Sequence, residues 1–126
     1  MLTAHQLIDL SFDAFSFDVC EALVGIIDCV ANMAIHGDSG PMRTIPRDKI
    51  VSLIDEAALL YATKRHNCEE PGAINPPYHN FTHALDVTQM TFCILIKYGA
   101  ALVLKPVQRL ALIIAAMCKN VQKQKQ

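Results

Sequence analysis

Two histidines and an aspartate are spaced so that one helix would present all three on the same side. His79 and His83 are four residues apart, and Asp86 follows three residues later. Residues at these spacings lie one above another on a helix face. Imidazole nitrogen is a ligand for zinc and related metals, and carboxylate oxygen suits harder cations. The spacing alone leaves two interpretations open, a metal site and a polar patch without a metal.

The segment before these histidines is rigid, and the segment after them is apolar at helical spacing. Pro76 and Pro77 are incompatible with a helix interior and hold the chain extended, at the end of a loop that begins at Asn67. A helix is therefore expected to begin within 79–83 and to continue to about Tyr98, with Gly99 near its end.

Three further helices follow from apolar residues that recur at the helical period. We expect one over 17–33 with Ser16 as its N-cap, one from about Pro46 that ends before Asn67, and one from about Pro106. Their apolar stripes are Val19, Leu23, Ile26, Ile27, Val30 and Met33; Ile50, Leu53, Ile54, Ala57 and Leu60; and Leu110, Ile113, Ile114 and Met117. The sequence lacks a long alternating run of the kind that strands produce, so the predicted fold class is all-α with several helices.

Composition and charge narrow the classes of protein. The chain has 126 residues, 52% of them hydrophobic and 18% charged, and a net charge of -1. This is slightly more apolar than an average soluble chain, which fits part of a larger core. A nucleic-acid-binding surface needs a basic excess that is absent here, so we expect no nucleic acid partner. The apolar run from Tyr98 to Cys118 contains Lys105 and Arg109, so no membrane span is expected.

Cysteine usage indicates a reducing compartment. Five cysteines are present, an odd number, and none forms a CxxC pair. A disulfide framework usually has an even number of cysteines in a loop-rich chain. We therefore expect free thiols and a cytoplasmic location.

Residues 78–89 carry the pattern Tyr-His-Asn-x-x-His-Ala-x-Asp-Val-x-Gln. The matching positions are Tyr78, His79, Asn80, His83, Ala84, Asp86, Val87 and Gln89. This pattern resembles the opening signature of the class I 3′,5′-cyclic nucleotide phosphodiesterases. Asn75-Pro76-Pro77, the Phe-Asp-x-Phe element in 10–15 and the apolar run 110–118 resemble flanking parts of the same family. The resemblance implies the N-terminal portion of the compact helical (HD-type) catalytic domain, with residues 1–118 in that domain and 119–126 an unstructured tail.

The resemblance also implies a role for each matched residue. His79 would be the general acid that protonates the leaving O3′, which suits the pKa of histidine. His83 would be a metal ligand, and Tyr78 would line the substrate pocket. Asn80 and Asp86 would lie behind the metal ligands and orient the imidazoles. The family is a hydrolase of signal transduction that converts cyclic AMP or cyclic GMP to the 5′-monophosphate, with zinc plus magnesium or manganese as cofactors.

The family pattern is lost after Cys118. The family continues with His-Asp, both metal ligands, whereas this chain continues with Lys119 and Asn120. A protonated lysine amine is a poor metal ligand. Catalytic zinc usually needs three protein ligands. We therefore expect the chain to be inactive by itself and not to hold the family's metals alone.

Two origins of this boundary stay open: a misplaced exon end, because Cys-Lys codons can contain a splice-donor sequence, or a diverged paralogue.

Two other functions are also compatible with the sequence. One is a non-catalytic helical interaction module that self-associates through apolar residues in 102–104 and 113–117, which would otherwise pack on further helices. The other is an unrelated metal- or haem-binding helical protein that uses His79 and His83.

Overall fold

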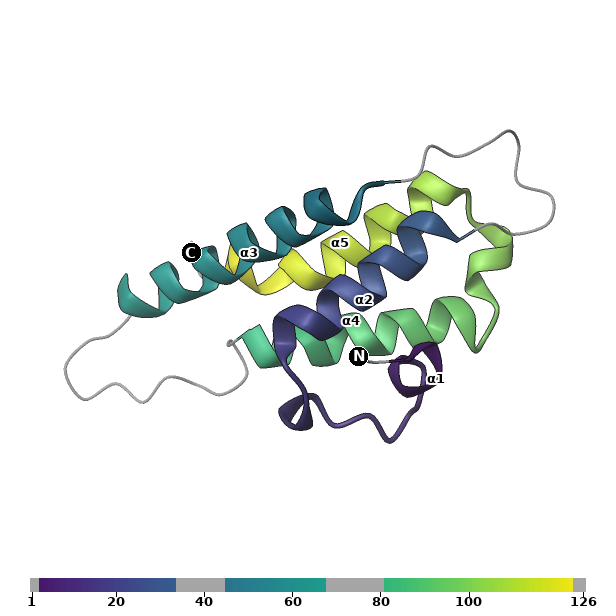
Figure 1. Cartoon of the computed structure of the whole chain (residues 1–126), viewed down its shortest axis with the longest axis horizontal. Coiled ribbons are helices and arrows are strands. Elements are labelled where there is room, and N and C mark those ends of the chain that lie inside the picture. The colour runs from purple at the N-terminus through teal and green to yellow at the C-terminus, as the bar shows by residue number, and fades with distance from the viewer. Residues whose placement is uncertain (1–2, 34–44, 68–80, 124–126) are drawn as a thin grey trace.

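Four long helices run side by side along the molecule in the computed structural model (Figure 1). The structure describes residues 3–33, 45–67 and 81–123. The long helices are α2 (Val19–Asn32), α3 (Arg47–Asn67), α4 (Phe81–Ile96) and α5 (Pro106–Lys123). Three short elements complete the described part: α1 (Ala4–Leu7), η1 (Ala14–Ser16) and η3 (Ala100–Val103). None of these residues forms a strand, so the all-α prediction is confirmed.

Helix α2 lies at the centre and contacts α1, α3, α4 and α5. Consecutive long helices alternate in direction, so the colour runs one way along α2 and α4 and the other way along α3 and α5 (Figure 1). The predicted stripe of α2 is largely buried, with Leu23, Ile26 and Val30 fully inside the core. Burial of such apolar side chains is the main term that stabilises the bundle.

The N-cap of α2 is Asp18, and the prediction of Ser16 is wrong. The Asp18 carboxylate accepts a hydrogen bond from the backbone N–H of Glu21 at 2.9 Å. The Ser16 hydroxyl instead donates to the carboxylate of Asp13, which caps the short helix η1. An aspartate gives both a cap and a negative charge at the positive end of the helix dipole, which is why it serves better than serine here.

The buried stripe of α3 differs from the prediction at its end. Ile50, Ile54 and Ala57 are buried as expected, but Leu60 is 50% exposed and Tyr61 is only 4% exposed. Spacings of four, three and four residues lead from Ile50 to Tyr61, so tyrosine continues the helical stripe and Leu60 lies beside it. Leu60 is apolar but exposed, because the position of a residue around the helix decides whether its side chain is buried.

Helix α5 begins as predicted but continues past the expected end. Gln108 accepts a hydrogen bond from the backbone N–H of Lys105 at 2.8 Å, which caps the start at Pro106. The helix runs to Lys123, so the prediction of an unstructured tail from residue 119 is wrong for 119–123. Lysine and glutamine are good helix formers, and neither glycine nor proline interrupts this stretch.

A tight connection joins α4 to α5. Gly99 has a φ of 79°, a conformation that favours glycine, and it ends the α4 region as predicted. Arg109 on α5 is buried, and its Nε donates to the carbonyl oxygen of Ala101 in η3 at 2.9 Å. The arginine thus holds the connecting segment against the helix that follows it.

The predicted unpartnered apolar surface is confirmed in one part and wrong in another. Leu102 and Val103 are 72% and 84% exposed, whereas Ile113 and Met117 are fully buried in the core. Met90 on α4 is also exposed. None of the described helices is long and apolar enough to cross a membrane. The predicted loop was expected to begin at Asn67, but this residue is the last of α3, and the rest of the loop lies outside the described residues.

Candidate functional site

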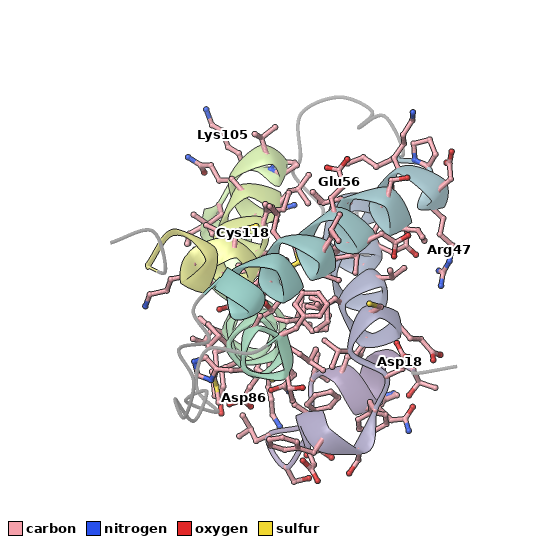
Figure 2. The ribbon with its side chains drawn as sticks, turned by 90° about the vertical axis from the view of Figure 1, so that its left-hand side faces the viewer. Asp18, Arg47, Glu56, Asp86, Lys105 and Cys118 are labelled. Carbon is pink, nitrogen blue, oxygen red and sulfur yellow. The ribbon has the colours of Figure 1, made fainter. Side chains whose placement is uncertain are left out.

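Helix α4 carries the described part of the histidine motif. It begins at Phe81, and His83 lies half-buried in its first turn. Asp86 is exposed one turn later, on the side of α4 turned away from α2 and α3 (Figure 2). His83 and Asp86 therefore share one helix, as the spacing predicts. The other candidate residues Tyr78, His79 and Asn80 lie outside the described residues.

The start of α4 and the last turns of α5 lie at the same end of the bundle, which faces the viewer in Figure 2. Tyr61 of α3 marks this meeting point. Its hydroxyl donates to the carbonyl oxygen of Met117 at 2.7 Å, and its ring lies 5.3 Å from the ring of Phe81. The segment with His83 and the segment with Lys119 and Asn120 are thereby brought to one end of the molecule.

The described residues at this end do not form a catalytic metal site. Lys119 is exposed on α5, where the resemblance would have required a histidine ligand. Burial raises the pKa of the neighbouring Cys118 thiol. Within 3–33, 45–67 and 81–123, no group of three or more His, Cys, Asp or Glu side chains could hold a metal ion.

Gln89, the last residue of the motif, has a structural contact. Its side-chain amide is buried and donates to the carbonyl oxygens of Leu7 at 3.0 Å and Asp9 at 2.8 Å. Four residues on, the Cys93 thiol donates to the carbonyl oxygen of Ile8 at 3.3 Å. Three consecutive carbonyls of the N-terminal segment are therefore bound by two side chains of α4.

Sequence reasoning missed Tyr61 and the contacts of Gln89. Tyr61 could have been found by extending the stripe of Ile50 and Ile54 to the next position of the helical repeat. The partners of Gln89 lie about 80 positions earlier in the chain, and local spacing carries no signal for such a pair. The free-cysteine prediction holds for Cys20, Cys29, Cys93 and Cys118, which are the cysteines that the structure describes.

Three comparisons with known proteins show what the chain is similar to. Residues 78–124 match the family of 3′5′-cyclic nucleotide phosphodiesterases. A cGMP-specific 3′,5′-cGMP phosphodiesterase 3 from Dictyostelium discoideum is 44% identical over 46 residues, which is 36% of this chain and 10% of the relative. The 3′,5′-cyclic-nucleotide phosphodiesterase regA of the same organism is 29% identical over 109 residues, which is 86% of this chain and 12% of the relative. No solved structure matches the chain significantly.

Over residues 78–124 the chain is therefore similar to the 3′5′-cyclic nucleotide phosphodiesterases, and the motif on α4 lies within this segment. It spans about a tenth of the length of the curated relatives that it matches. The family match ends at residue 124, so the resemblance extends beyond Cys118, where we had placed its end.

Proposed function

We propose that this chain supplies the N-terminal part of a cyclic nucleotide phosphodiesterase catalytic domain and does not hydrolyse cyclic nucleotides by itself. One observation carries the proposal. The start of α4, with His83, meets the end of α5, where Lys119 and Asn120 stand in place of the His-Asp pair that the resemblance implies. The approach of these two segments supports an origin in the family's fold, and the residue types at 119–120 support the proposed inactivity.

Each motif residue keeps its proposed role within a complete catalytic domain. His79 acts as the general acid, Tyr78 lines the nucleotide pocket, and His83 is a metal ligand. Asn80 and Asp86 orient the imidazoles. The exposure of Asp86 leaves its carboxylate accessible to a partner that lies beyond the described residues. Family membership suggests dependence on metals, and we propose zinc with magnesium or manganese for the complete domain.

The proposed substrate class of the complete domain is a 3′,5′-cyclic nucleotide, cyclic AMP or cyclic GMP. The names of both relatives specify hydrolysis of this class, and one of them is specific for cyclic GMP. A cytoplasmic location is proposed on the free thiols of the described cysteines, which suit a reducing compartment.

A hydrolysis assay tests the proposed inactivity. The purified chain is incubated with cyclic AMP or cyclic GMP in the presence of zinc and magnesium, and the 5′-monophosphate is quantified by chromatography. We expect no more product than a His79→Ala variant gives. Turnover well above that variant would show that the chain is a functional enzyme and would overturn the proposal.

A second candidate function is a non-catalytic helical interaction module that self-associates. The exposed side chains of Leu102, Val103 and Val107 favour it, because they follow one another at the turn between α4 and α5. Sedimentation velocity over a range of concentrations tests this function. Association that a Leu102→Ser/Val103→Ser variant abolishes would support it, and a monomer at all concentrations would exclude self-association through this surface.

A further inference from the structure

Tyr61 is the side chain through which three helices meet at the candidate site. It projects from α3 and is 4% exposed. Its hydroxyl donates to the backbone carbonyl of Met117 on α5, and its ring is tilted by 44° against the ring of Phe81 on α4. A buried tyrosine hydroxyl needs a hydrogen-bond partner, so its bond to Met117 fixes the direction in which the ring points.

The two contacts of Tyr61 fall beside the two segments of the candidate site. Phe81 is the first residue of α4 and precedes His83 by two positions. Met117 precedes Lys119 by two positions. The first turn of a helix lacks part of its internal hydrogen bonding, so its position depends on packing against neighbouring elements. Tyr61 and Phe81 provide that packing for the turn that contains His83.

The hydrogen bond to Met117 is additional to the bonds of the helix. A backbone carbonyl has two lone pairs, and within α5 one of them accepts the N–H of the next turn. The Tyr61 hydroxyl uses the remaining capacity. Loss of the hydroxyl would therefore leave α5 helical and would remove this hydrogen bond between α3 and α5, which makes the contact suitable for a precise test.

We propose that Tyr61 is a positioning residue that fixes the His83-bearing start of α4 relative to the end of α5. The inference rests on the proposed function for its biological meaning, because it assigns Tyr61 to the site of the phosphodiesterase family. Its physical content is independent of turnover. The position and environment of His83 depend on the Tyr61 hydroxyl and on the contact between the Tyr61 and Phe81 rings.

The test compares Tyr61→Phe with Tyr98→Phe, which makes the same chemical change at a side chain that is 63% exposed. The imidazole signals are recorded by NMR on histidine-labelled protein, and the His83 signal is assigned with a His83→Gln variant. Hydrogen–deuterium exchange is measured along α2, α4 and α5. We expect Tyr61→Phe to shift the His83 signal and to speed exchange in 85–88 by about tenfold relative to α2.

Two results would overturn the positioning role of Tyr61. If Tyr61→Phe lowers the melting temperature but leaves the His83 signal and the relative exchange of α4 as in Tyr98→Phe, Tyr61 is only a core residue and the proposal is overturned. Should Tyr61→Phe not fold, Phe81→Leu perturbs the other contact and keeps the hydroxyl. An unshifted His83 signal in that variant would also overturn the proposal. Neither readout uses a metal or a substrate, so failure of the proposed function would not be mistaken for failure of this inference.

Discussion

The side-chain amide of Gln89 donates a hydrogen bond to the carbonyl oxygen of Asp9 across 2.8 Å, and so joins residues 80 positions apart. The second hydrogen of the same amide is directed to the carbonyl oxygen of Leu7 at 3.0 Å. Gln89 is thus used as a donor, and an acceptor in its place would face two carbonyl oxygens. These two hydrogen bonds from Gln89 hold the N-terminal segment against α4.

Replacement of Gln89 by glutamate is therefore expected to be severe. Gln89→Glu keeps the shape but places a carboxylate against the carbonyls of Leu7 and Asp9, which should lower the free energy of unfolding by about 2–4 kcal/mol at pH 7. Burial beside two carbonyl oxygens raises the pKa of the new carboxyl in the folded state. The loss in free energy of unfolding that Gln89→Glu causes should therefore become smaller as the pH falls through the raised pKa of the new carboxyl. Urea unfolding at several pH values measures both effects.

Gln108→Glu is the matched control for this change. Gln108 is exposed, and its side-chain oxygen accepts a hydrogen bond from the N–H of Lys105 at the start of α5. A carboxylate can accept the same bond and is favoured near a helix N-terminus. We expect no loss of stability from Gln108→Glu. Equal destabilisation by both substitutions would contradict the donor role of Gln89.

Arg109 and Arg47 should differ in their contribution to stability. Arg109→Ala removes a buried side chain and its bond to Ala101, and should cost about 3 kcal/mol in the free energy of unfolding. Arg47→Ala removes an exposed ion pair with Asp28 at 3.7 Å and should change the free energy of unfolding by about 0.5 kcal/mol or less. Thermal or urea unfolding of both variants checks the difference, and similar losses would show that Arg109 does not anchor η3.

The Cys93 thiol should be protected from alkylation in the folded chain. Burial raises its pKa, so the reactive thiolate is scarce, and the thiol also donates to Ile8. Iodoacetamide at pH 8 should modify Cys93 at least roughly tenfold more slowly in buffer than in urea, as read by peptide mass spectrometry. Burial of the neutral Cys93 thiol stabilises the folded chain fully below the ordinary thiol pKa of about 8.5. This stabilisation is lost as the pH rises through the raised pKa of the thiol in the folded state. Equal rates in the two conditions would show that the site is open.

Much of the fold could be predicted from local spacing. The starts of the helices at Pro106 and near Pro46, and the turn at Gly99, follow from backbone chemistry that acts within a few residues. The misassignments have equally physical reasons. Leu60 is apolar but lies off the buried stripe. Residues 119–123 are mostly polar yet continue α5, because lysine and glutamine favour the helix and neither glycine nor proline interrupts it.

The candidate site was less accessible to sequence reasoning. The motif predicts His83 and Asp86 on one helix, and the structure agrees. The approach of α4 to the end of α5 depends on tertiary contacts such as the bond between Tyr61 and Met117, 56 positions apart. Spacing along one helix contains no information about a partner at that distance. The roles of Tyr78, His79, Asn80, His83 and Asp86 stay predictions.

The most direct test of the account is a zinc titration of the chain and of a Lys119→His/Asn120→Asp variant by isothermal calorimetry. We propose that the helices of a phosphodiesterase site are present in this chain and that residues 119–120 do not supply the metal ligands. The unmodified chain should bind no zinc stoichiometrically. The variant should bind one zinc ion at least roughly a hundredfold more tightly, and His83→Ala in that background should abolish the gain. A variant that binds zinc no better than the unmodified chain, or a gain that survives loss of His83, would contradict the account.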